Sequence, residues 1–122
     1  MGATFKELEP QAAMTQYEIR WANLPAPIGR RPVLLLTRSQ AYAYLNKVIV
    51  AEVTTTIRGI PEEVLLSARE GLSRGSVVNL DNLHVVPTSI LGDRLGRLSS
   101  QRAREIKRAL GYALDWAELK IL

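Results

Sequence analysis

The segment at residues 48–57, VIVAEVTTTI, constrains the fold most, because β-branched side chains dominate it. Such residues favour an extended chain that packs on a pleated surface, so we predict a strand here. The pattern changes near the end of the chain, where apolar side chains recur every three or four residues across 103–117. This spacing predicts one amphipathic helix, with Ser99 or Ser100 as its N-cap. Gly111 inside that helix is expected to allow close packing.

Shorter strands are predicted on both sides of that segment, separated by turns rich in Pro and Gly. They lie at residues 18–24, 32–37, 63–66, 76–86 and 94–98. A short helix capped by Ser39 is predicted at 39–47, and a loop at 68–75. Five or six short strands followed by one helix predict an α+β chain that is mainly β. We expect a small, SH3-like, curved antiparallel sheet or barrel covered by a C-terminal helix.

The chain has 122 residues, the length of one domain. Residues 1–13 show no sustained period, so we interpret them as a leader outside the core, with Met14 as a candidate start. Residues 14–122 are interpreted as a single domain. The apolar runs are far too short to cross a bilayer and no signal peptide is recognised, so we expect a cytoplasmic protein with no membrane partner.

The chain has no cysteine and a single histidine, His84. This composition excludes disulfides, thiol nucleophiles, cysteine-ligated zinc and multi-histidine metal sites. It does not exclude a carboxylate site for a hard cation. We expect neither a metal nor another cofactor.

The charge balance gives a first indication of function. Sixteen Lys and Arg face twelve Asp and Glu, for a net charge of +4, and twelve of the sixteen basic residues are Arg. This balance fits an ordinary basic surface, but it also fits a polyanionic partner such as nucleic acid. Arg suits the second interpretation because its planar guanidinium pairs with phosphate through two hydrogen bonds.

A set of segments, in this order and at this spacing, resembles the MazF/PemK family of toxin endoribonucleases. The resemblance covers nearly all of residues 17–118. The matching segments are YEIRW (17–21), PIGRRPVLLLT (27–37), VIVAEVTTTIR (48–58), EVLLS (63–67), EGL (70–72), RGSVVNLDNL (74–83) and LGRLS (95–99). The resemblance implies a fold of the CcdB and MazF type, a homodimer, and metal-independent cleavage of single-stranded RNA. It also implies a cognate acidic antitoxin whose tail covers the RNA cleft.

The same resemblance implies roles for individual residues. Arg31, before the proline of the second strand, and Thr54, at the end of the third, match the family's two central catalytic positions. Asp81 and Asn82 match an acidic–amide pair that contacts RNA. The neighbouring loops add further candidate RNA contacts, which are Gly29, Arg30 and Arg58.

The sequence also departs from the family pattern. The first loop is shortened to Gly29-Arg30-Arg31, where the family commonly has Gly-Ser-Glu-Gln before the arginine. Gln16-Tyr17 replaces the usual Arg-Gly, and His84 replaces an arginine often found after the acidic–amide pair. These differences affect the expected base preference more than the expected reaction.

RNA carries its own nucleophile, the 2′-OH, so an enzyme has to align it, stabilise charge on phosphorus and move protons. Arg31 is expected to act as an electrostatic stabiliser and candidate acid, and Thr54 as a hydroxyl donor. The expected products are a 2′,3′-cyclic phosphate and a 5′-hydroxyl. His84 and Asp81 are the candidates for the general base.

Two other functions remain open on sequence grounds. A CcdB-like poison of DNA gyrase would have the same fold, cut no RNA and act through the C-terminal residues 116–122. A non-catalytic RNA-binding barrel is the other alternative. The presence of both Arg31 and Thr54 favours the nuclease.

Overall fold

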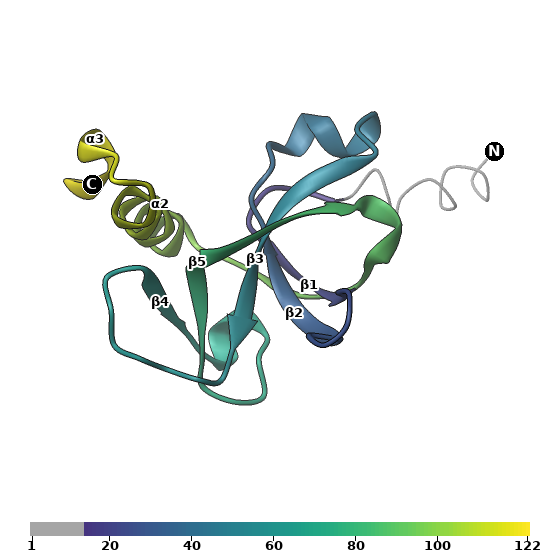
Figure 1. Ribbon diagram of the computed structural model, residues 1–122, viewed down its shortest axis with the longest axis horizontal. Coiled ribbons are helices and arrows are strands. Elements are labelled where there is room, and N and C mark those ends of the chain that lie inside the picture. The colour runs from purple at the N-terminus through teal and green to yellow at the C-terminus, as the bar shows by residue number, and fades with distance from the viewer. Residues whose placement is uncertain (1–13) are drawn as a thin grey trace.

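The computed structural model describes residues 14–122, and Figure 1 shows how its elements are arranged. Six strands form one antiparallel sheet in the order β4–β5–β3–β2–β1–β6. The strands are β1 (Glu18–Asn23), β2 (Arg30–Leu35), β3 (Lys47–Thr54), β4 (Glu63–Leu66), β5 (Ser76–Pro87) and β6 (Leu91–Arg97). Three 3-10 segments, η1 (Ser39–Ala43), η2 (Ala68–Glu70) and η3 (Thr88–Ile90), lie in the connections. Helices α2 (Ser100–Leu114) and α3 (Ala117–Lys120) follow the sheet.

Side chains alternate between the two faces of the sheet, and each face carries its own hydrophobic cluster. One cluster lies beneath α2, which contributes Ile106 and Ala109 and packs on β4 and β5. Its other buried members are Ile19, Leu34, Ala51, Val53, Val64, Leu66, Leu72, Val78, Leu80 and Leu98. The second cluster, on the opposite face, includes Tyr42 from η1. Its other members are Met14, Ala22, Leu24, Val33, Leu35, Val48, Val50 and Val86.

The sheet is strongly curved, so that its two ends approach each other without closing. The chain after β4 runs against β6, where two glycines allow backbone to touch backbone. A Cβ atom on Gly71 would collide with the Leu95 carbonyl, and one on Gly96 would collide with the Glu70 carbonyl. The predicted fold class, a curved antiparallel sheet with a C-terminal helix, is confirmed, and the sheet remains open rather than forming a closed barrel.

Helix α2 begins where Ser99 accepts a hydrogen bond from the Arg102 N–H at 3.2 Å, which confirms one of the two predicted caps. The predicted continuation to Ala117 is wrong. Asp115 has left-handed backbone angles that end α2, and the chain turns back as α3. Gly111 permits this turn, because a Cβ there would lie only 2.8 Å from Leu119 Cβ.

Other predictions were close but differ in detail. The strand at 63–66 is confirmed, whereas β3 ends at Thr54 rather than residue 57, because the Thr54 hydroxyl accepts the Thr56 N–H at 3.2 Å. Ser39 does not cap η1; its hydroxyl accepts the Gln16 N–H instead, at 2.9 Å. The predicted loop at 68–75 contains η2. The predicted leader, residues 1–13, lies outside the described residues.

The described helices include none that is both long and apolar enough to span a membrane.

Candidate active site

Three neighbouring strands place charged side chains on one face of the sheet. Glu52 of β3 is opposite Val33 of β2, so it lies on the same face as Arg31, which is two residues before Val33. His84 of β5 is opposite Val50, which brings it to that face too. Arg31 Nη1 donates to one Glu52 oxygen at 3.0 Å, and His84 Nε2 lies 2.5 Å from the other. We call this group the Arg31–Glu52–His84 cluster.

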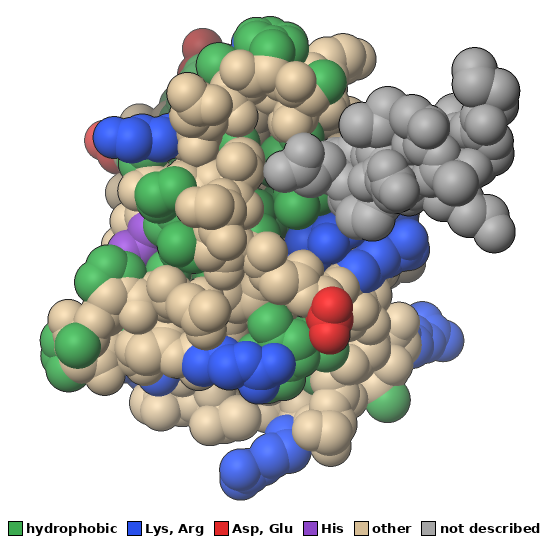
Figure 2. Space-filling model, turned by 90° about the vertical axis from the view of Figure 1, so that its right-hand side faces the viewer, with side chains coloured by type: hydrophobic (Ala, Val, Ile, Leu, Met, Phe, Trp, Pro, Cys, Tyr) green, Lys and Arg blue, Asp and Glu red, His purple; other side chains and the backbone are tan. Residues whose placement is uncertain are grey.

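Glu52, at the centre of the cluster, is buried, whereas Arg31 and His84 are partly accessible to solvent. The Glu52 side chain is 9% exposed, whereas the Arg31 and His84 side chains are 33% and 26% exposed. A carboxylate removed from water needs partners for both oxygens, and here each oxygen has one. The remaining Arg31 and His84 atoms can therefore contact a ligand at the surface. In Figure 2 the histidine reaches the surface at the margin of the face shown.

Thr54 lies on the same face as this cluster, because it follows Glu52 by two residues along β3. Its hydroxyl oxygen accepts one hydrogen bond, from the Thr56 N–H. A hydroxyl can accept and donate at once, so the Thr54 O–H can still donate to a ligand. The structure thus brings the two predicted catalytic residues, Arg31 and Thr54, to one face of adjacent strands.

Asp81 and Asn82 lie on a bulge of β5. Ala51 is paired with Leu83, but the next residue of β3, Glu52, is paired with Asn79. The three residues of β5 between these pairs therefore have no partner on β3. Leu80 turns into the core, while Asp81 and Asn82 are exposed. The bulge is held locally, since Asn79 Oδ1 accepts the Asp81 N–H at 2.9 Å.

The remaining predicted contacts lie in loops. Gly29 has a φ of +73°, which favours glycine, at the end of the β1–β2 loop. The Arg30 guanidinium lies 3.9 Å from the centre of the Trp21 ring. Arg58 is exposed in the β3–β4 loop, where Glu63 accepts its backbone N–H at 3.0 Å. Within residues 14–122 no hydrogen bond or ion pair joins Arg58 to the Arg31–Glu52–His84 cluster.

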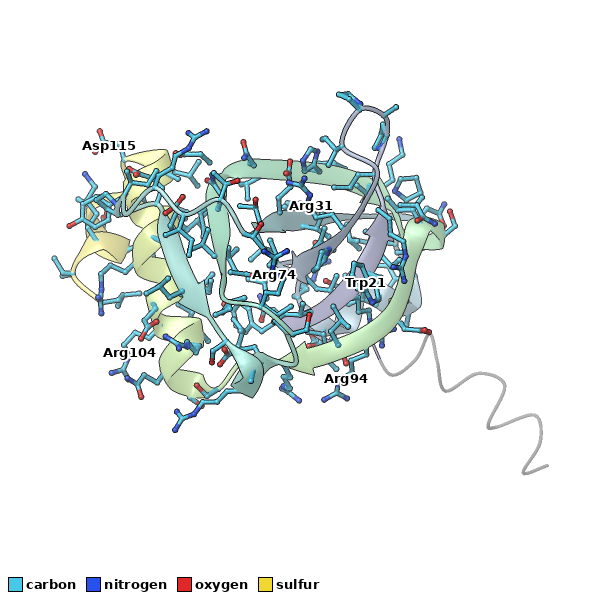
Figure 3. All side chains as sticks on the ribbon, turned by 90° about the horizontal axis from the view of Figure 1, so that it is seen from below. Trp21, Arg31, Arg74, Arg94, Arg104 and Asp115 are labelled. Carbon is cyan, nitrogen blue, oxygen red and sulfur yellow. The ribbon has the colours of Figure 1, made fainter. Side chains whose placement is uncertain are left out.

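A pocket lies at the same end of the sheet, on the opposite face of β2 and β3. Trp21, Pro32, Thr55 and Arg74 contribute to its lining, and Figure 3 shows Arg31, Arg74 and Trp21 in this region. Pro32 and Thr55 directly follow the two predicted catalytic residues in sequence. Because Pro32 follows Arg31 along β2, its side chain lies on the other face, and the pocket is separate from the surface that carries Arg31 and Thr54.

Residues 15–114 match the family described as PemK-like, MazF-like toxins of type II toxin–antitoxin systems. The chain belongs to this family. The resemblance indicated by the sequence is therefore confirmed, and Arg31 and Thr54 stand in the order and spacing on which it rested.

Several MazF proteins are similar to this chain. A Mycobacterium tuberculosis protein named "Probable endoribonuclease MazF5" is 44% identical over 99 residues, covering 80% of this chain and 90% of that protein. Endoribonuclease MazF3 of the same organism is 42% identical, covering 70% and 85%. The solved toxin MazF-mt6 superposes with a TM-score of 0.76 at 39% identity, covering 80% and 96%. A mycobacterial endoribonuclease in complex with its cognate antitoxin gives 0.75 at 25% identity, covering 84% and 96%.

Sequence reasoning missed Glu52 as a member of this MazF-like site. A signal was present, because Glu52 is the only charged residue in the apolar run 48–57. Charged residues are rarely buried without a partner, so a carboxylate within such a strand indicates a paired basic group. Its two partners are 21 and 32 residues away in sequence, and only the strand register identifies them.

Proposed function

We propose that this chain is the toxin of a type II toxin–antitoxin system, a sequence-selective endoribonuclease that cleaves single-stranded mRNA without a metal. One observation carries the proposal: Arg31 and Thr54, which the sequence resemblance matches to the family's catalytic positions, lie on one face of adjacent strands with groups available to a ligand. The endoribonuclease activity named for its MazF relatives supports it. The net charge of +4 fits a polyanionic substrate, and Figure 2 shows several Lys and Arg side chains on the face it presents.

The reaction needs little covalent chemistry from the protein. The 2′-oxygen attacks phosphorus, the P–O5′ bond breaks, and the 2′-OH proton leaves. The products are a 2′,3′-cyclic phosphate and a 5′-hydroxyl, and no water is added. Arg31 has five N–H donors, and its hydrogen bond to Glu52 uses one of them. The others can donate to the phosphoryl oxygens, where negative charge grows in the transition state, and the Thr54 hydroxyl donates beside them.

RNA is proposed to lie across Arg31, Thr54 and the β5 bulge. Asp81 and Asn82 are exposed there and provide side chains that can read base edges. Arg30, stacked on Trp21, adds a cation and an aromatic surface beside the pocket.

The partners proposed for this chain are a second copy of itself and a cognate antitoxin with an acidic tail. Solved MazF relatives bound to their antitoxins support the second partner. An acidic, extended peptide and RNA both present negative charge along an extended chain, so both are proposed to occupy the same surface around Arg31 and Thr54. The protein is proposed to act in the cytoplasm. Titrating the complex with RNA that carries a 2′-deoxy group at the cleavage site tests this, since shared occupancy requires each ligand to weaken the other.

The gyrase-poison alternative rests on the C-terminal end, where Trp116 and Ile121 are 51% and 84% exposed. A single set of assays separates the functions. The purified chain is incubated with a long RNA in EDTA, and in parallel with DNA gyrase. We expect metal-independent fragments and unchanged supercoiling. Inhibited supercoiling without RNA fragments would support the gyrase poison. An RNA gel shift without fragments would support the non-catalytic RNA-binding barrel.

A further inference from the structure

We propose that Glu52 is a positioning residue that fixes the proton of His84 on Nε2, so that Nδ1 is left as the general base for the 2′-OH. The inference rests on the proposed function and adds to it the identity of the base, for which both His84 and Asp81 were candidates. It starts from the Arg31–Glu52–His84 cluster, in which one buried carboxylate is bonded to the two accessible side chains.

The chemistry of the three groups determines where the protons lie. An arginine is always a donor, and an ionised carboxylate is only an acceptor. One Glu52 oxygen accepts from Arg31, and the other lies 2.5 Å from His84 Nε2. A neutral imidazole has one N–H and one lone pair, so His84 can bond to this carboxylate only with its proton on Nε2. The lone pair is then on Nδ1.

The surroundings of His84 leave Nδ1 available. No hydrogen bond within residues 14–122 uses this nitrogen, and the His84 side chain is 26% exposed. Glu52 lies beneath it with only 9% exposure. Solvent and RNA can therefore reach the imidazole from one side while the carboxylate holds it from the other. Asp81 lacks such a support, because the hydrogen bond found at Asp81 engages its backbone N–H rather than its carboxylate.

In the resulting step the 2′-OH proton moves to His84 Nδ1 as the O2′–P bond forms. The P–O5′ bond breaks, the leaving O5′ takes a proton from water, and the imidazolium returns its proton to solvent. The imidazolium that forms is stabilised by the Glu52 carboxylate on its other nitrogen. Glu52 and His84 would then have the same roles as the carboxylate and the histidine of a serine-protease triad, in which the carboxylate also selects the tautomer of the histidine.

The substitution Glu52→Gln tests the inference, because it retains the shape of the side chain but reverses one hydrogen bond. Arg31 can only donate, so the Gln carbonyl oxygen has to face Arg31 and the Gln NH₂ has to face His84. His84 must then accept at Nε2, and its proton moves to Nδ1. The readout is the pair of imidazole ¹⁵N chemical shifts, measured without a polyhistidine tag and at a pH that leaves the ring neutral. His84 is the only histidine, so the signals need no further assignment.

We expect the Nε2–H form in the wild type and the Nδ1–H form in Glu52→Gln. RNA cleavage should fall by at least ~100-fold, the contribution typical of a lost general base. Glu18→Gln is the matched control, because Glu18 is also a buried carboxylate bonded to an arginine, Arg20. It should leave the His84 tautomer unchanged.

A second comparison separates catalysis from mere support of the fold. His84→Ala should also lose at least ~100-fold, and adding Glu52→Gln to it should cost no further activity, because the base is already absent. The inference is overturned if wild-type His84 carries its proton on Nδ1, or if His84→Ala cleaves as the wild type does. A wild type that cleaves no RNA would instead refute the proposed function, while the tautomer result would still stand on its own.

Discussion

The substitution Arg31→Ala should separate catalysis from stability at the candidate site. The catalytic loss follows from removing a donor to the developing negative charge, which typically costs ~10²–10³ in rate. The stability loss follows from Glu52, whose 9%-exposed side chain would keep His84 but lose its other partner. A buried acceptor left without a donor costs about 1–3 kcal/mol.

The lower half of that stability range is expected, because Arg31 is 33% exposed and water can enter the space it leaves. For a domain of this size, 1 kcal/mol lowers the melting temperature by roughly 4 °C. The assays are urea unfolding and initial rates of cleavage of a single-stranded RNA. Arg31→Lys is the charge-preserving control, which should recover stability but remain impaired in cleavage because an ammonium cannot form the guanidinium fork.

The double variant Arg31→Ala with Glu52→Gln provides the discriminating result. Removing the buried charge together with its partner should restore part of the lost stability, but no cleavage. If Arg31→Ala is as stable as the wild type, the ion pair contributes nothing to the fold. If the purified variant cleaves RNA at the wild-type rate, Arg31 has no place in the mechanism.

Thr54, Gly111 and Tyr42 provide further tests. Thr54→Val keeps the shape of the side chain but removes the hydroxyl donor, so the cleavage rate should fall ~10²-fold, whereas Thr54→Ser should retain most of the wild-type rate. Equal initial rates for Thr54→Val and the wild type would remove Thr54 from the site. Gly111→Ala should destabilise by about 1–3 kcal/mol in urea unfolding, because its Cβ would press on Leu119 of α3 at 2.8 Å, and this overpacking outweighs the ~1 kcal/mol gain in helix propensity. Burial raises the pKa of Tyr42 to about 12 from 10.0, so the folded state disfavours the tyrosinate. Stability should therefore fall as pH rises from 10 toward 12, and Tyr42→Phe should reduce that dependence in urea unfolding.

The strands were predictable because local composition determines them. The β-branched run around β3 and the short segment of β4 were both located, and the position of β4 was correct. The end of α2 could not be predicted from periodicity, because apolar side chains keep recurring every three or four residues past Asp115, as far as Ala117. The backbone at Asp115 turns left-handed to let α3 pack on Gly111, which is a tertiary effect.

The candidate site was predictable only in part. Arg31 and Thr54 were identified by resemblance, and the register confirms that they share a face of adjacent strands. The bulge that exposes Asp81 was not foreseen, because the segment 76–86 was predicted as one continuous strand, although its apolar positions change parity between Leu80 and Leu83. Glu52 was missed because its role depends on two partners on other strands, and sequence alone does not give the register that unites them.

End-group analysis of the RNA products tests the central claim most directly. A defined single-stranded RNA is cleaved in EDTA by the wild type, with Arg31→Ala prepared in the same way to exclude a contaminating nuclease, and the fragments are examined by mass spectrometry. We predict 2′,3′-cyclic phosphate and 5′-hydroxyl ends from the wild type, ~10²–10³-fold slower release of fragments from Arg31→Ala, and no cleavage where a 2′-deoxy nucleotide replaces the one at the cut. Fragments with 3′-hydroxyl and 5′-phosphate ends, or cleavage that persists at the 2′-deoxy position, would contradict the mechanism.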